Sequence, residues 1–138
     1  MALAQSVHQG LLNHFFGKST YTAETIYVGL SSTQPTSTGG NVTEPSGGAY
    51  ARVQTAASDW NSATAADPSE TTNANEIAFA EATADWLSGA DLGWAVFYSA
   101  ASGGTFLGFG ACATPKPVYA GDTAKFKAGE ISVTLGSA

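Results

Sequence analysis

The chain has 138 residues, with 5 Lys and Arg against 11 Asp and Glu and a formal net charge of −6. So few cations argue against nucleic-acid binding, and the one cysteine cannot form an internal disulfide. No apolar run reaches the ~20 residues that cross a membrane, and no basic stretch precedes the apolar N-terminal segment as it would in a signal peptide.

Residues 2–16 are predicted to form the one helix of the chain. Apolar side chains recur there every three or four positions and build a broad face. The members of this face are Leu3, Val7, Leu11, Leu12, Phe15 and Phe16. Gly17 follows at the position where a left-handed residue commonly ends a helix. Because the segment has no Asp, Glu, Lys or Arg, we expect it to be covered on more than one side, by its own domain or by a neighbouring subunit.

Short alternating strands follow the helix. The candidates are 25–30, 50–56, 76–82, 92–99, 105–113, 123–127 and 130–135. Turn residues at 101–104 predict a hairpin, and Ala128-Gly129 predicts a second hairpin between the last two strands. The sequence predicts a mainly β fold, an antiparallel sandwich of the jelly-roll or Ig-like kind with about seven or eight strands.

Two polar segments interrupt the strands. Residues 31–48 and 58–75 are rich in Ser, Thr, Gly, Asn or Asp and show no periodicity, so both are predicted to be long loops. The expected organisation is a single domain over 1–138, with the helix at 2–16 and the sandwich at 25–135. Whether these loops are ordered without a partner stays open.

Residues with catalytic or ligand-binding chemistry are sparse. His8 and His14 lie six positions apart, roughly 120° around a helix, so they cannot act as a metal-binding pair on adjacent turns. Cys112 has no base beside it and is expected to be a buried small hydrophobe. Gly108-x-Gly110 has the spacing of a dinucleotide fingerprint but does not open a helix, so its glycines are expected to let a backbone or an aromatic ring approach a strand. No catalytic residue, metal ligand or cofactor is predicted, and the chain is not expected to be an enzyme.

Acidic residues and tryptophans admit more than one interpretation. No Lys or Arg occurs from 54 to 114, where seven carboxylates lie. A solvated acidic face, or one that meets a basic partner, is favoured over a glycosidase pair or a calcium site. Trp60 and Trp86 follow Asp59 and Asp85 in loop-like segments, and a role in the core or an interface is favoured over sugar binding.

Several longer segments resemble small virion proteins of tailed bacteriophages and prophages, which are often labelled tail-fibre-like or left as uncharacterised structural proteins. The segments are LLNHFFGKSTYTAETIYVGLSSTQPT (11–36), EPSGGAYARV (44–53), NEIAFAEATADW (75–86), FYSAASGGTFLGFGA (97–111) and PKPVYAGDTAKFKAGEISVTL (115–135). Their order along the chain carries the resemblance, and LSGADLGW (87–94) departs from the pattern. The resemblance implies a non-enzymatic part of a phage particle, assembled in the host cytoplasm.

The size and the low charge of the chain favour a position on the capsid of the phage particle. Only 12% of the residues are charged, about half the usual share, which suits either a chain buried in an assembly or a compositional bias of the genome. A capsid decoration (cement) protein is the first expectation, a tail or tail-fibre subunit the alternative, and a carbohydrate-binding module the second alternative.

The expected partners are other virion proteins, either the major capsid protein or tail proteins. A homo-oligomer, with a trimer as one possibility, is expected, and neither nucleic acid nor membrane is expected as a partner. The proposed interface residues are Leu3, Val7, Leu11, Phe15, Tyr21, Tyr50, Trp60 and Trp86.

Overall fold

The fold is known from a computed structural model, which describes residues 1–136. It is mainly antiparallel β with one α-helix, as the sequence predicts. The described residues form β1 (Ala2–Leu3), α1 (Gln5–Phe15), β2 (Tyr27–Ser31), β3 (Val53–Gln54), β4 (Ser69–Thr72), β5 (Ile77–Ala78), β6 (Leu92–Tyr98), β7 (Phe106–Lys116), β8 (Lys125–Phe126) and β9 (Ser132–Leu135). Two 3₁₀ turns, η1 (Ala57–Asp59) and η2 (Trp86–Gly89), lie between them.

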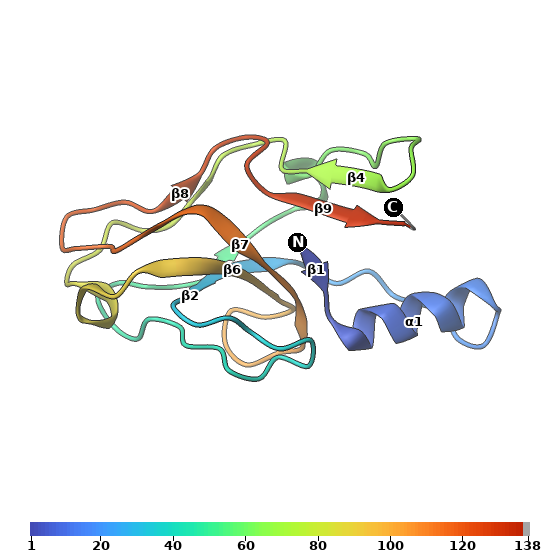
Figure 1. Ribbon diagram of the computed structural model, residues 1–138, viewed down its shortest axis with the longest axis horizontal. Helices are drawn as coiled ribbons and strands as arrows, with labels where there is room; N and C mark the ends of the chain where they lie inside the picture. Colours follow the sequence, from blue (N-terminus) through green and yellow to red (C-terminus); the bar gives the residue numbers. More distant parts are fainter. Residues whose placement is uncertain (137–138) are drawn as a thin grey trace.

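The strands form one large sheet and two small ones. The large sheet has the order β1-β7-β6-β2-β3, and the small sheets pair β4 with β9 and β5 with β8. In Figure 1 the strands β4, β8 and β9 lie in a layer above β2, β6 and β7, which is a sandwich-like arrangement. The predicted hairpin at 101–104 is present between β6 and β7, where Gly103 and Gly104 have positive φ angles of 64° and 75°.

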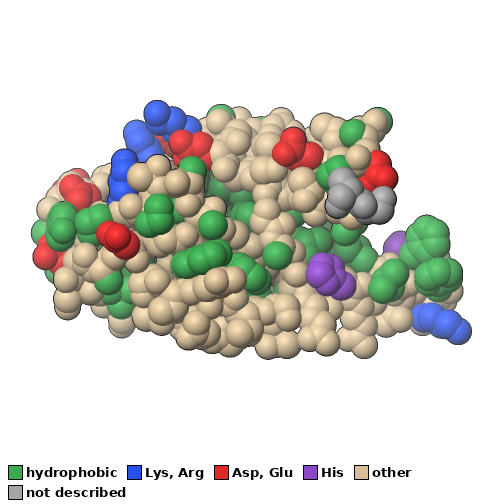
Figure 2. Space-filling model, in the orientation of Figure 1, with side chains coloured by type: hydrophobic (Ala, Val, Ile, Leu, Met, Phe, Trp, Pro, Cys, Tyr) green, Lys and Arg blue, Asp and Glu red, His purple; other side chains and the backbone are tan. Residues whose placement is uncertain are grey.

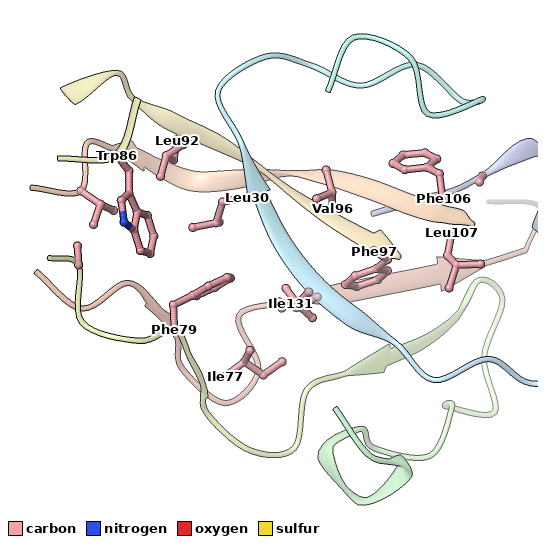
Figure 3. Close-up of a cluster of buried hydrophobic side chains, with 14 of the residues drawn as sticks. Leu30, Ile77, Phe79, Trp86, Leu92, Val96, Phe97, Phe106, Leu107 and Ile131 are labelled. Atoms are coloured by element: carbon pink, nitrogen blue, oxygen red, sulfur yellow. The ribbon is translucent and has the colours of Figure 1, made fainter. Parts of the chain in front are cut away.

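The core lies between these layers and is rich in aromatic rings (Figure 3). Val28 and Val96 from the large sheet are fully buried, and Trp86 is 1% exposed. The Trp86 ring lies edge-on to Tyr50 at 5.1 Å and to Phe79 at 6.3 Å, and its indole N–H donates to the Gly48 carbonyl at 2.8 Å. The core therefore also holds the end of the 31–48 loop against the sandwich.

The helix begins at Gln5, so the predicted start at residue 2 is wrong. Ala2 and Leu3 instead form β1, which pairs with Phe109 and Gly108 of β7. Glycine makes this pairing possible, because a Cβ on Gly108 would lie 2.7 Å from the carbonyl oxygen of Ala2. The expectation that these glycines allow a close backbone approach is confirmed, and the sandwich includes residues before position 25.

The predicted C-terminal hairpin is wrong. Strand β8 pairs with β5 and strand β9 with β4, so the last two strands belong to different sheets. Asn73 is 1% exposed and fixes this arrangement, because its side chain accepts from the N–H of Ile131 at 2.9 Å and donates to the Lys127 carbonyl at 2.8 Å. The chain between β8 and β9 is thereby bonded to another segment instead of closing on itself.

Part of the predicted loop 58–75 is also a strand. Residues Ser69–Thr72 form β4, paired along its length with β9, and η1 lies at the start of the segment. The strand contains Glu70 and three hydroxyl residues and lacks the apolar alternation on which the prediction relied. With β1 and β4 added, the described residues hold nine strands, against the seven or eight expected.

Candidate functional site

Two unpartnered apolar surfaces stand out on this chain. The first, which we name the arm, consists of α1 and the returning segment 16–25. In Figure 1 the arm extends from one end of the molecule, away from the sheets. Its base is attached by the N–H of Ala4, which donates to the Leu107 carbonyl, and by the N–H of Gln5, which donates to the Ser37 carbonyl, both at 2.9 Å.

The tip of the arm is apolar and exposed. Phe15, Phe16 and Leu12 are 79%, 69% and 61% exposed, and the two phenyl rings contact each other edge to face with centroids 5.0 Å apart. Figure 2 shows hydrophobic side chains gathered at the end of the molecule where α1 projects in Figure 1. Val7 is the one residue of α1 that is buried, and Leu11 is partly buried against the core, so the helix is attached to the fold along its first two turns and not at its end.

The returning segment packs along the helix without covering the tip. The Tyr21 ring lies over Gly10, where a Cβ would be 2.8 Å from a ring carbon. The backbone N–H of Tyr21 donates to Nδ1 of His14 at 3.2 Å. Burial, and then the nearby Glu24 carboxylate, raise the pKa of Tyr21. These contacts hold the arm together as a unit in which Leu12, Phe15 and Phe16 stay free.

The second surface is an open groove of about 1050 Å³ between β6 and β7 on one side and residues 122–132 on the other. Figure 2 shows hydrophobic side chains along a recess on this face. The large side chains that line it are the half-buried Trp94, Phe109 and Phe126, together with the core residues Leu30, Phe79, Leu92 and Ile131, which are only 3–5% exposed. Its volume is at the upper end of the ~300–1,000 Å³ typical of ligand pockets.

The groove is open because the two layers do not meet there. Strand β1 covers the outer edge of β7 only at Gly108 and Phe109, and no other described strand pairs with that edge. Across the groove, β8 pairs with β5 and β9 with β4, so neither extends the large sheet. Trp94, Phe109 and Phe126 are consequently half-buried rather than enclosed.

The rim of the groove concentrates positive charge. Lys116, Lys125 and Lys127 line it and are three of the five cations of the chain. Figure 2 shows Lys and Arg side chains gathered at this end of the molecule, over β8. Asp122 and Glu130 also contribute to the lining, so the rim carries both signs with an excess of lysine.

The groove also contains the cysteine of the chain. Cys112 is half-buried there, and burial, followed by the Glu130 carboxylate, raises the pKa of its thiol to about 11. The thiol is therefore protonated at neutral pH and a poor nucleophile. Among residues 1–136 no group of three or more His, Cys, Asp or Glu side chains is placed to hold a metal ion. No helix of the described chain has the length and hydropathy to span a membrane.

The structure places the predicted interface residues in two groups. Phe15 is exposed at the arm tip, and Leu3, Leu11 and Tyr21 are half-buried along the arm and its base, where Val7 is buried. The aromatic residues of the second group pack within the sandwich. Its members are Tyr50, Trp60 and Trp86.

These three side chains have intramolecular partners. The Tyr50 hydroxyl donates to Glu44 at 2.6 Å, and the indole N–H of Trp60 donates to Thr55 Oγ1 at 3.0 Å. Trp86 is in the core. Trp60 and Trp86 thus do not form a shared exposed platform on which a sugar could stack.

Sequence analysis missed part of the site. Leu12 and Phe16 belong to the predicted apolar helix face but not to the predicted interface residues. The absence of charged residues from 2–16 nevertheless indicated that the whole helix is covered. Nothing in the sequence indicated the groove. Its walls come from strands far apart in the chain, and β8 and β9, expected to pair with each other, belong to different sheets.

The comparisons with known proteins identify one family. A family model described as Podophage GP4 fiber I protein gp80 matches residues 2–134. No curated protein matches the chain. The matched range includes the arm, the large sheet, and both walls of the groove.

Proposed function

The chain belongs to the podophage GP4 fiber I protein gp80 family, and from this premise we propose that it is a non-enzymatic subunit of a tail fibre that takes part in host attachment. Membership makes the chain a fibre-related structural protein of a bacteriophage virion. Its position on the particle and its role in attachment are the proposal.

The exposed apolar arm carries this proposal. Monomeric soluble proteins rarely expose a contiguous cluster of large apolar side chains, and such clusters commonly mark protein–protein contacts. Phe15, Phe16 and Leu12 form such a cluster on a helix that has no charged residue. A subunit that is covered by neighbours in a fibre accounts for both features.

The family description favours the tail or fibre alternative over capsid decoration. Decoration of the capsid was the first expectation from size and low charge, and neither property distinguishes head from tail. The description names a fibre protein, so we propose the fibre position. The carbohydrate-binding alternative has less support, because Trp86 is buried in the core and the half-buried Trp60 packs against Phe97.

Labelling of the virion tests the position. An epitope inserted in the exposed segment at 62–63, followed by gold-labelled antibody and electron microscopy, should mark the tail end of the particle. Virions without the chain should adsorb more slowly to host cells, and supplying the chain in trans should restore adsorption. Label spread over the head, or unchanged adsorption, would contradict the proposal. A tagged major capsid protein serves as the control for labelling of the head.

A further inference from the structure

We propose that copies of this chain associate head to tail, with the arm tip of one copy seated in the groove of the next. The inference deepens the proposed function, on which it rests, by naming a partner for the arm. Both surfaces are apolar, both lack a partner in the single chain, and one projects where the other is recessed (Figure 2).

The arm cannot fill the groove of its own chain. The hydrogen bonds of Ala4 to Leu107 and of Gln5 to Ser37 fix the direction in which α1 leaves the sheet. From that base the helix extends away from the sheets (Figure 1). The groove is lined by residues of β6, β7 and the 122–132 segment. Reaching its own groove would require breaking these bonds and the β1–β7 pairing, so the occupant comes from a second copy.

Charge at the two surfaces is complementary. The arm from Gln5 to Phe16 has no carboxylate, and its tip is the C-terminal end of a helix, which carries a partial negative charge. The groove rim presents Lys116, Lys125 and Lys127. In the proposed contact we expect Lys18, the cation beyond the tip, to lie toward the carboxylates Asp122 and Glu130 on the same rim. The chain as a whole is acidic, so this rim is the region where a second copy is least repelled.

The area of the contact sets its strength. Two largely exposed Phe side chains and one Leu supply roughly 400 Å² of apolar surface, given ~150–250 Å² for a buried aromatic residue. The groove contributes less area than the tip, so the contact buries well under ~800 Å², which is smaller than the ~1,200–2,000 Å² of stable interfaces. We therefore expect a dissociation constant of roughly 10 µM to 1 mM for one contact. Repetition along an assembly would strengthen it.

Sedimentation equilibrium of the purified full chain tests the association. We expect the mean mass to rise with concentration toward about 1 mM. The arm variant Phe15→Ser with Phe16→Ser should bind at least tenfold more weakly. Ala111→Trp, which adds bulk to an exposed position in the groove lining, should do the same, with Thr114→Trp as a second groove variant if the first does not fold. Tyr119→Ser is the matched control, because Tyr119 is an exposed aromatic residue outside both surfaces and should leave the association unchanged.

Mixing the two variants distinguishes this contact from any symmetric one. The arm variant retains its groove and the groove variant retains its arm. Together they should form a one-to-one heterodimer and no longer species. An arm-to-arm contact would give no heterodimer.

Three results would overturn the inference. They are a wild-type chain that stays monomeric to about 1 mM, an arm variant that associates like the wild type, and a mixture that forms no heterodimer. The test is independent of where the chain sits on the virion. Labelling on the head together with heterodimer formation would reject the proposed function and support the head-to-tail contact.

Discussion

At the residue scale, one ion pair joins three separate segments. Arg52 is bonded to Glu44 through Nη2 at 2.6 Å and Nε at 3.0 Å, and its Nη1 donates to the carbonyls of Ala100 and Gly103 at 2.9 Å. The guanidinium lies over the Tyr98 ring at 3.6 Å. The segment EPSGGAYARV (44–53) thus fastens the 31–48 loop and the β6–β7 hairpin to the edge of the large sheet.

Replacing Arg52 by Ala should lower the free energy of unfolding by about 1.5–3 kcal/mol, because the part-buried Glu44 would keep only its hydrogen bond from Tyr50 and lose the charge-assisted bonds from Arg52. The side chains of the pair are only 9% and 19% exposed. Lysine at this position should also destabilise, since an ammonium cannot reproduce the bidentate contact. Urea denaturation measures the free energy of unfolding of each variant.

Lys125→Ala is the matched control for Arg52. Lys125 is 3.8 Å from Glu76, and both side chains are half exposed, so its removal should cost less than about 1 kcal/mol. Equal losses for the two variants would contradict the structural role assigned to Arg52.

Cys112 should react slowly in the folded chain. Burial raises the pKa of its thiol to about 11, whereas an unperturbed thiol titrates near 8.5. At about pH 8 the thiolate fraction is therefore far smaller in the folded state, and alkylation should be more than tenfold slower than in urea. The rate should climb as pH rises toward 11. Equal rates in the folded and unfolded chain would contradict this environment, and mass spectrometry of the alkylated protein measures them.

At the element scale, the position of the arm depends on β1. Two residues of strand and the hydrogen bonds of Ala4 and Gln5 attach α1 to the sheet. This attachment needs a glycine at position 108, because a Cβ there would lie only 2.7 Å from the Ala2 carbonyl oxygen of β1. A helix attached at one end by so short a strand projects from the fold and presents its apolar tip to other molecules.

Gly108→Ala should displace β1 and lower the free energy of unfolding by about 1–3 kcal/mol, the usual cost of inserting an atom where there is no room. Hydrogen exchange of the Ala4 amide should become faster, because its acceptor Leu107 adjoins the substituted residue. Gly93→Ala is the control. A Cβ there would lie 3.5 Å from Pro115, an ordinary contact, so this variant should be neutral or slightly stabilising. Unchanged exchange at Ala4 in Gly108→Ala would refute the role of the glycine.

At the scale of the whole molecule, the residues that stabilise the fold are separate from the surfaces that are available to other molecules. The core between the layers holds the chain together, and the arm tip packs on nothing within it. The groove is a gap in the sandwich that the single chain leaves open. A polypeptide with these features keeps two apolar surfaces available for neighbours.

Phe15→Ser with Phe16→Ser should change the free energy of unfolding by less than about 1 kcal/mol, because exposed side chains contribute little and serine is only a slightly poorer helix former. Phe97→Ala, which removes a ring that is 5% exposed, should cost about 3–5 kcal/mol. Thermal and chemical unfolding measure both variants. A large loss of stability in the arm variant would mean that the tip packs against its own fold.

The sequence predicted the elements that have strong local signals. The period of the apolar residues gave α1 to within three residues, and alternation in 92–99 with glycine at 103 and 104 gave the β6–β7 hairpin. It failed at β4, where Ser, Glu and Thr form a strand without an apolar period, because pairing with β9 stabilises that strand. It left Trp86 between the core and an interface, because burial of a loop residue depends on neighbours distant in sequence, and the structure places it in the core.

The sequence by itself determined the mainly β character, the uncharged apolar helix and the family, because these depend on local period, composition and residue order. Only the tertiary structure decided which apolar residues stay exposed and that β8 and β9 separate to leave a groove. The physical reason is that exposure and pairing are set by contacts between distant segments. Buried Asn73 forms hydrogen bonds with the segment between β8 and β9 and so fixes one wall of the groove. Gly108 leaves room for the backbone of β1 and so fixes the direction of the arm.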